Sequence, residues 1–156
     1  IENIKNKYKN IVFIKRPAYL SKDNTTSYLS SIHSINWYSQ KISNIKNIIL
    51  LQPTNPFRIE TKINKAFNFF LENKKKSLVS VSPIKFLKKN KENFISVKIV
   101  EKQFFVNGNF YIINSANLIK YKNFHNKESE YFINNTYKES IDIDTKRDWL
   151  DFKKLV

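Results

Sequence analysis

Asp142 and Asp144 are the residues whose type and spacing point most directly to chemistry. In a strand, residues two apart point to the same side, so both carboxylates would face one cleft while Ile141 and Ile143 pack behind them. Two carboxylates suit Mg²⁺, which prefers one or two of them together with waters and phosphate oxygens. The competing interpretation, commoner for so short a motif, is a solvated strand end where one aspartate caps a helix starting at Thr145.

A second polar position follows the apolar run 48–51. Such a run predicts a strand buried on both faces, and Pro53 ends it because proline has no amide donor for the sheet. Pro56 keeps the preceding residue out of helix, so a loop should follow. Gln52 would then lie at the carboxyl end of a central strand, where open α/β sheets bind ligands. The pattern predicts a pocket floor at Gln52.

Arginine is rare in this lysine-rich chain and occurs only at Arg16, Arg58 and Arg147. A guanidinium offers a rigid bidentate fork that lysine cannot copy, so these positions are candidates for geometry-dependent contacts. For Arg147 a surface ion pair is an equal alternative. Arg16 precedes the capping stretch 23–27, whose hydroxyls and free amides could bind a base edge or phosphate, although most such stretches only cap a helix.

The segment around the single glycine, Gly108, is a further candidate. Where glycine is so rare, its position should require positive φ or a close backbone approach. Asn107 precedes this glycine and Tyr111 lies three residues after it. The polar side chain of Asn107 and the aromatic ring of Tyr111 could contact a sugar. The alternative is a turn asparagine and a tyrosine at the edge of the core.

Strands and helices should alternate to position these residues. Residues 1–9 are interpreted as the end of a helix, and 84–93 as a lysine-rich loop. Apolar runs and helical spacing predict, in the first half, a strand at 11–14, a helix from the capping stretch to 41, a strand at 48–52, and a helix at 59–73 with Ile63, Ala66, Phe67 and Phe70 as its inner face. In the second half they predict a strand at 78–81, a hairpin arm at 94–100, a turn at 107–109 entering a strand to 113, and a helix at 115–121. A strand at 140–144 and a closing helix at 145–156, with Trp149, Phe152, Leu155 and Val156 inward, complete the order. This alternation predicts one α/β domain over 1–156 with a mostly parallel, Rossmann-like sheet flanked by helices.

Composition narrows the class of protein. The 156 residues carry a net charge of +15, which raises the hypothesis of nucleic-acid binding, but the lysines are scattered and form no arginine-rich stripe. We therefore expect nucleic acid not to be the main partner. The chain has no cysteine and no apolar run of membrane-spanning length, so we expect no membrane association and a cytoplasmic location. It also has no methionine, and we expect it to be a fragment.

Five strings, in order, resemble the acylneuraminate cytidylyltransferases, which activate sialic-type sugars with CTP. Residues 50–58 read LLQPTNPFR against the family's LLQPTSPLR, and residues 16–23 resemble RPAELAxD. Residues 77–81 resemble SVVSV, 107–112 resemble NGAIYI, and 140–145 resemble SIDIDT. The related 3-deoxy-manno-octulosonate enzymes carry QGDEP where this chain has QPTNP.

The resemblance implies roles for individual residues. The fold would be that of the nucleotide-diphospho-sugar transferases, and the reaction would be attack of the sugar's anomeric hydroxyl on the α-phosphate of CTP, with release of pyrophosphate. The implied sites are Arg16, Thr25 and Ser27 for CTP; Gln52, Asn107, Tyr111 and Phe124 for an acidic nine-carbon sugar; and Asp142 and Asp144 for Mg²⁺ and catalysis.

The sequence also departs from the family pattern. No string matches the family's opening ARGGSKxxxxKN-like loop, so we expect the first strand-loop-helix unit to be lacking and the 156 residues alone to be inactive. Residues 84–106 are shorter than the region that builds the family's dimer arm, so the resemblance implies a homodimer with a reduced arm there. The acidic sugar is left open among neuraminic, legionaminic and pseudaminic types. The alternatives are a catalytically dead sugar- or nucleotide-binding module, a different sugar nucleotidyltransferase, and a basic nucleic-acid binder.

Overall fold

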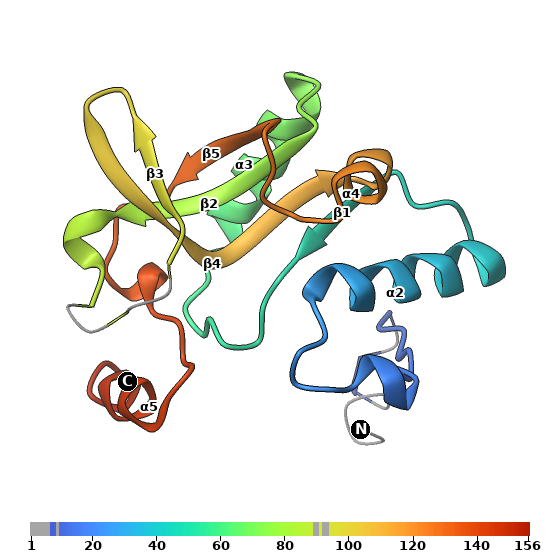
Figure 1. Ribbon diagram of the computed structural model, residues 1–156, viewed down its shortest axis with the longest axis horizontal. Coiled ribbons are helices and arrows are strands. Elements are labelled where there is room, and N and C mark those ends of the chain that lie inside the picture. Colours follow the sequence, from blue (N-terminus) through green and yellow to red (C-terminus); the bar gives the residue numbers. More distant parts are fainter. Residues whose placement is uncertain (1–6, 9, 89–90, 92–93) are drawn as a thin grey trace. The chain divides into compact units, whose positions relative to one another are not determined.

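A computed structural model describes residues 7–8, 10–88, 91 and 94–156, and the chain divides into two compact units, residues 1–45 and 46–156 (Figure 1). Most of the helix end predicted at 1–9 lies outside the described residues, as do 89–90 and 92–93 of the predicted lysine-rich loop. None of the helices in the described part of the chain is long and apolar enough to cross a membrane.

The first unit contains a short 3₁₀ helix, η1 (Ala18–Leu20), and the helix α2 (Ser27–Lys41). The predicted start of α2 is confirmed, since the Thr26 hydroxyl caps it by accepting a hydrogen bond from the Leu29 amide. The strand predicted at 11–14 is wrong. No strand occurs among residues 7–8 and 10–45, and Ile11 and Val12 are exposed. An apolar run becomes a strand only where another strand pairs with its backbone.

The second unit is built on one sheet with the strand order β1-β4-β2-β5, in which β3 also pairs with β4. The strands are β1 (Asn47–Leu50), β2 (Ser77–Pro83), β3 (Ser96–Ile99), β4 (Lys102–Asn114) and β5 (Ser129–Ile133). The helices are α3 (Glu60–Glu72), α4 (Ser115–Tyr121) and α5 (Lys146–Lys153), with 3₁₀ turns η2 (Ile84–Phe86) and η3 (Lys138–Ser140).

The predicted α/β class is confirmed, but the prediction of a mostly parallel sheet is wrong. β4 runs antiparallel to β1, β2 and β3, and the one parallel pair within the described sheet is β2 with β5. β1 and β2 do run in the same direction with α3 between them, as a βαβ pattern requires. β4 nevertheless enters between them, because strands linked through a helix need not be neighbours.

This arrangement also corrects the prediction for the Gln52 strand. In the described sheet β1 pairs with β4 alone, so it lies at the edge and not at the centre. It ends at Leu50, and Ile49 and Leu51 are exposed. A four-residue apolar run therefore did not indicate burial on both faces.

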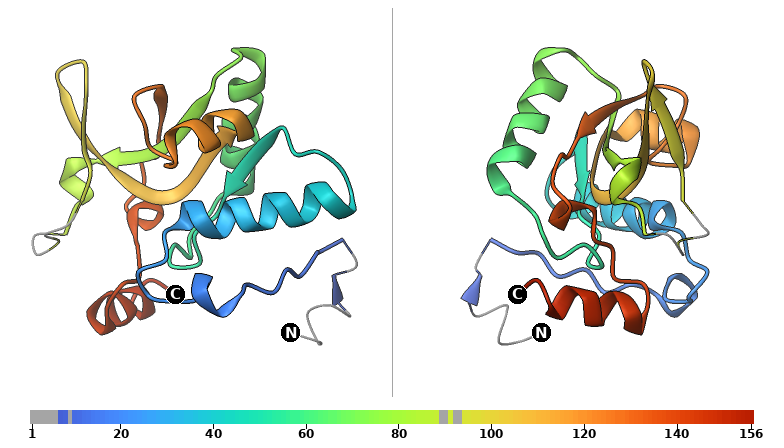
Figure 2. Two further views of the ribbon diagram at one scale, coloured as in Figure 1. Left: turned by 45° about the vertical axis from the view of Figure 1, so that its right-hand side comes forward. Right: turned by 90° about the vertical axis from the view of Figure 1, so that its left-hand side faces the viewer.

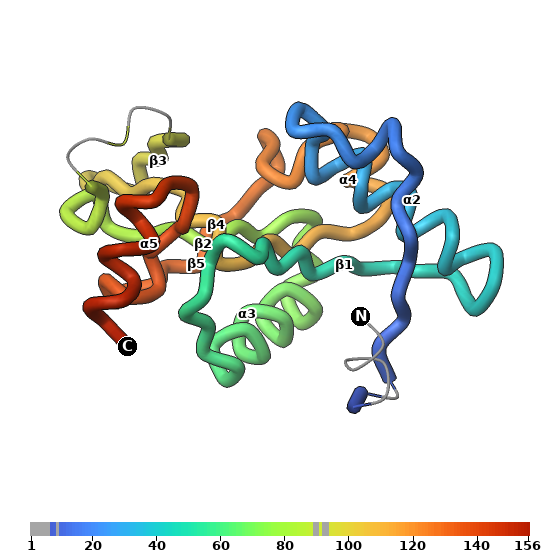
Figure 3. Tube along the Cα trace, turned by 90° about the horizontal axis from the view of Figure 1, so that it is seen from below, coloured from blue at the N-terminus to red at the C-terminus, as the bar shows by residue number. Residues whose placement is uncertain are grey.

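Helices cover both faces of the sheet, with α3 and α4 on opposite sides (Figures 2 and 3). The predicted inner face of α3 is confirmed. Its Ala66 and Phe70 pack against Leu78 of β2 and against Phe110 and Ile112 of β4. Because side chains alternate along a strand, Tyr111, which lies between Phe110 and Ile112, is directed to the other face.

A bulge interrupts β4 where the sequence predicted a turn. Val79 pairs with Tyr111 and Val81 with Val106, so a step of two residues on β2 opposes a step of five on β4, and three extra residues are accommodated. Asn107–Asn109 thus lie inside a long strand, and the predicted turn is wrong. The extra residues bend the strand and leave part of its backbone without ladder partners.

Four predictions for the later elements had different outcomes. The hairpin arm at 94–100 is confirmed as β3, and the helix at 115–121 as α4. The strand at 140–144 is wrong, since those residues belong to η3 and the unpaired segment after it. Of the closing helix, only α5 forms, and Trp149 and Val156 are exposed instead of inward.

An ion pair between Lys62 on α3 and Glu139 on η3 joins two elements far apart in sequence. Their side-chain atoms are 2.6 Å apart, and the Glu139 side chain is 2 % exposed. Glu139 also accepts a hydrogen bond from the Thr136 hydroxyl. A buried carboxylate that loses its counter-charge is strongly destabilised.

We therefore expect Lys62→Met to lower the free energy of unfolding by about 2 kcal/mol, less than for a fully buried pair because Lys62 is partly exposed. Lys65→Met, at an exposed lysine on the same helix, is the matched control and should change stability by less than about 0.5 kcal/mol. Urea unfolding of both variants measures the difference. Equal effects of the two substitutions would contradict this role for Lys62.

Candidate functional site

The loop after β1 is held against the β4 bulge by two side chains. The Arg58 guanidinium donates through Nε to the Asn109 carbonyl at 2.9 Å and through a second nitrogen to the Gln52 carbonyl. Asn55, fully buried, donates to the Asn107 carbonyl at 3.2 Å and accepts from the Asn109 side chain at 2.9 Å. The arginine fork thus makes the geometry-dependent contact predicted for Arg58, and it fixes the backbone around Gln52.

The segment that carries the two aspartates is tied to the same loop. The Ile143 amide donates to the Thr54 carbonyl at 2.8 Å, and the Asn109 side chain reaches the Glu139 carbonyl at 3.3 Å. Residues 52–58, 107–110 and 139–144 therefore meet in one place. Each of these segments overlaps one of the five strings that resemble the cytidylyltransferases.

Gln52 lies directly over the only glycine. The φ of Gly108 is +73°, and a Cβ atom added there would lie 2.7 Å from Gln52 Oε1. Both reasons anticipated for this glycine, positive φ and close approach, are confirmed. The absence of a side chain at Gly108 sets where the Gln52 carboxamide can lie.

Asn107 supports the bulge from inside. Its side-chain oxygen accepts hydrogen bonds from the Ser80 hydroxyl at 2.6 Å and from the Asn109 amide at 3.0 Å, and its nitrogen donates to the Ser82 hydroxyl at 2.8 Å. The residue is 2 % exposed. The resemblance implied that the Asn107 side chain contacts the sugar. In the structure this side-chain amide is hydrogen-bonded to protein groups instead.

Tyr111 and Phe124 form an aromatic pair on the sheet face opposite α3, with ring centroids 5.7 Å apart. Burial, and secondarily the negative charge of Asp142, raise the pKa of the Tyr111 phenol to about 12. The phenol is therefore protonated at neutral pH and can donate a hydrogen bond. Two residues predicted to bind the sugar are thus brought together, and the Tyr111 phenol lies close enough to Asp142 for the carboxylate charge to raise its pKa.

Asp142 and Asp144 converge on one cation even though they do not lie on a strand. Lys91 Nζ is 3.1 Å from Asp142 Oδ2 and 3.4 Å from Asp144 Oδ2. The described residues contain no group of three or more histidine, cysteine or acidic side chains placed so that they could hold a metal ion together. Two carboxylates around one positive charge nevertheless fit Mg²⁺, which completes its coordination with water and phosphate oxygens.

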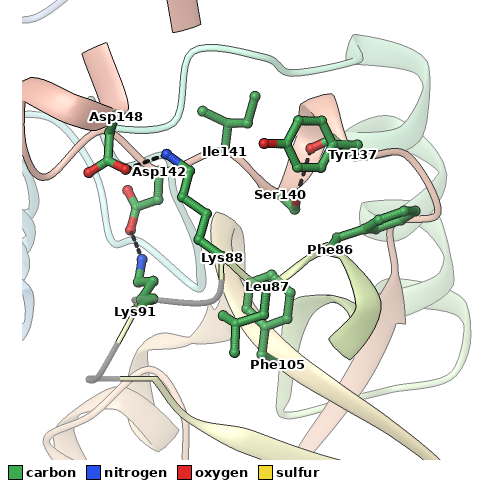
Figure 4. Close-up of a pocket in the computed structure, with 10 residues that line it drawn as sticks. All are labelled: Phe86, Leu87, Lys88, Lys91, Phe105, Tyr137, Ser140, Ile141, Asp142 and Asp148. Atoms are coloured by element: carbon green, nitrogen blue, oxygen red, sulfur yellow. Dashed lines mark hydrogen bonds and ion pairs between the residues drawn. The ribbon is translucent and has the colours of Figure 1, made fainter. Parts of the chain in front are cut away.

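Asp148 lies beside this pair but has other partners (Figure 4). Its Oδ1 pairs with Lys88 Nζ at 2.5 Å, and its Oδ2 accepts from the amide and hydroxyl of Thr145, which caps α5. The helix cap is thus made by Thr145 and Asp148, not by Asp144. The cavity among these side chains has a volume of about 20 Å³, which holds about one water and excludes a nucleotide.

The residues predicted to bind CTP belong to the first unit. Arg16 donates to the Ser30 hydroxyl at 3.1 Å, and Ser27 is the first residue of α2. Thr25 precedes the cap and donates its amide to the Lys22 carbonyl at 3.0 Å. All three therefore lie around the start of α2. In the same unit, the Nε2 atom of His33 on α2 contacts the Lys15 carbonyl at 3.2 Å.

The buried polar residues behind the site were not anticipated. Asn55 and Glu139 are buried, yet nothing in their local sequence distinguishes them from exposed residues of the same types. Asn109, also buried, had one signal in the sequence, its position next to the only glycine. Nothing in the sequence distinguished Lys91 from the many other lysines of the chain.

No family model matches the chain. It is similar to the CMP-N,N'-diacetyllegionaminic acid synthase of Legionella pneumophila, with 33 % identity over 126 residues, which cover 70 % of this chain and 53 % of the relative. The chain thus spans about half the length of this relative. This similarity supports a relationship to the cytidylyltransferases, as the five strings had indicated.

Gly108→Ala should destabilise the protein by about 1–2 kcal/mol, because alanine is strained at positive φ and its methyl group meets Gln52. In a Gln52→Ala background the contact is absent and only the cost of φ remains, so the effect should be smaller. Chemical unfolding of the four proteins of this cycle measures both terms. Unchanged stability in Gly108→Ala would contradict the requirement for glycine.

Asp148 should contribute stability that is lost in acid. Burial acts to raise its pKa, but hydrogen bonds from Lys88 and Thr145 and the charge of Lys88 outweigh it and lower the pKa to about 2, from 3.8 for the free side chain. The folded state therefore binds this proton more weakly than the unfolded state. The contribution is complete above pH 3.8 and disappears as the pH falls toward 2.

The free-energy difference between wild type and Asp148→Asn should thus be about 1–2 kcal/mol at pH 5 and should shrink toward zero near pH 2. Glu101→Gln, at an exposed carboxylate on the β3–β4 turn, is the control and should show little difference at either pH. Urea titrations at a series of pH values supply the data. A difference for Asp148→Asn that does not vary with pH would show that its charge is not responsible.

Proposed function

We propose that the chain carries the sugar-binding and metal-binding part of a cytidylyltransferase that transfers CMP from CTP to a nine-carbon acidic sugar. The observation that carries the proposal is the meeting of residues 52–58, 107–110 and 139–144 around a carboxylate pair that shares one cation. The similarity to a CMP-sugar synthase adds support. The sugar would be of the class to which N,N'-diacetyllegionaminic acid belongs.

Three residues would contact the sugar. The Gln52 carboxamide lies over Gly108, where it can donate and accept hydrogen bonds to hydroxyl and carboxylate groups. The neutral Tyr111 phenol can donate to an oxygen of the sugar, and the aromatic faces of Tyr111 and Phe124 suit its C–H surfaces. Asn107 would act indirectly, by holding the bulge that positions Gly108 and Tyr111.

The reaction is attack of the anomeric hydroxyl oxygen on the α-phosphorus of CTP, with loss of the hydroxyl proton to water. The bond from the α-phosphorus to the bridging oxygen of the β-phosphate breaks, and pyrophosphate leaves. Asp142 and Asp144 would hold Mg²⁺, which when bound offsets the charge of the phosphates. Arg16, Thr25 and Ser27 are proposed to bind CTP, with the arginine and the hydroxyls contacting the base or phosphate.

Pyrophosphate release tests the proposal. The full reading frame of the gene is supplied with CTP, Mg²⁺ and a panel of nine-carbon acidic sugars, and the 156-residue chain is assayed in parallel. We expect release with one sugar from the full reading frame, a loss of at least about 100-fold in Asp144→Asn, and none from the 156 residues alone. Asp151→Asn, at a nearby aspartate outside the pair, is the matched control and should remain active.

Absence of release with every sugar from a folded protein would overturn the enzymatic proposal. Sugar or nucleotide binding that persists under those conditions would then favour the dead binding module. Turnover of CTP by the 156 residues alone would contradict the expectation that the triphosphate loop is required.

A further inference from the structure

Lys91 occupies the position that a metal ion would need. Its ammonium lies between the two carboxylates, 3.1 Å from Asp142 Oδ2 and 3.4 Å from Asp144 Oδ2. Asp142 is 20 % exposed and Asp144 54 % exposed, so the pair is buried on one side and open on the other. An ammonium and a divalent cation cannot share this space, because like charges within about 4 Å repel strongly at the edge of a protein.

The neighbouring lysine has a different role. Lys88 pairs with Asp148 at 2.5 Å and with Asp151 at 3.1 Å, and thereby attaches the segment after η2 to α5. Both oxygens of Asp148 already have partners, in Lys88 and in the α5 cap. Asp148 and Lys88 thus form a closed set of contacts, and Lys91 is the cation that faces the aspartate pair.

Lys91 leaves one carboxylate oxygen of the aspartate pair without a partner. Asp142 Oδ1 is inaccessible to solvent and has no hydrogen-bond partner within the described part of the chain, while its Oδ2 contacts Lys91. A buried carboxylate oxygen without a partner carries a large desolvation cost. A divalent cation with its bound waters could engage both oxygens, which one ammonium does not do.

We propose that Lys91 is a resident counter-ion of the Asp142–Asp144 pair, which neutralises it when no metal is bound and must leave before a divalent cation can enter. This inference rests on the proposed metal site of the cytidylyltransferase. Lys91 is then a positioning residue that sets the affinity for metal. Its removal exposes the carboxylates at all times.

The test is Mn²⁺ binding to the 156-residue chain, measured from the electron paramagnetic resonance signal of free Mn²⁺. We expect Lys91→Met to bind with a dissociation constant at least about tenfold lower than that of wild type, because the competing charge is gone. Lys98→Met, at a lysine paired with Glu101 on the hairpin, is the matched control for net charge and should match wild type. Adding Asp144→Asn to Lys91→Met should abolish the gain and so assign the bound ion to the pair.

Lys91→Gln, which removes the charge but keeps a hydrogen-bond donor, is the second variant and carries the same expectation should Lys91→Met not fold. Equal Mn²⁺ affinities in wild type and both variants, all lost with Asp144→Asn, would overturn the role of Lys91 but leave the metal site standing. No Mn²⁺ binding by any of the proteins would overturn both. A tenfold gain shared by Lys98→Met would show a general charge effect and refute the specific one.

Discussion

The second unit depends on buried side-chain amides that replace backbone pairing where β4 bulges. Three extra residues in that strand leave amides and carbonyls without ladder partners, and such groups are costly to bury unpaired. Within the sheet, the Asn107 side chain accepts a hydrogen bond from the Asn109 backbone amide, and the Ser80 hydroxyl accepts one from the Phe110 amide. From the loop after β1, Asn55 donates to the Asn107 carbonyl and Arg58 donates to the Asn109 carbonyl. Removing any one of these side chains leaves others without partners, so the set works as a unit.

The same set of bonds brings the candidate site together. The loop that carries Gln52 is held in place because Arg58 and Asn55 bond to the bulge, and the aspartate segment is held because Ile143 bonds to that loop. Gly108 then allows the Gln52 side chain to lie against the bulge. Strand β4 thus links packing to chemistry, with Phe110 facing the core under α3 and Tyr111 facing Phe124.

The charges of the chain have two levels of organisation. Most of the +15 excess comes from scattered lysines, which say little about function. Lys62, Lys88 and Lys91 differ because each meets a carboxylate that is largely withdrawn from water. Burial makes these pairs consequential, whereas ion pairs between exposed residues contribute little.

Local pattern by itself determined the α/β class, the start of α2, the inner face of α3 and the need for glycine at 108. Each depends on neighbours within a few residues or on the conformational limits of one residue type. Tertiary structure alone decided that β4 enters between β1 and β2, that residues 11–14 and 140–144 form no strand, and that Asn107 supports a bulge. It also decided that one lysine among many lies between the two aspartates. These outcomes depend on which distant segments meet. A strand forms only where a second strand pairs with it, and a lysine is a counter-ion only where a carboxylate lies beside it. The local sequence does not indicate either partner.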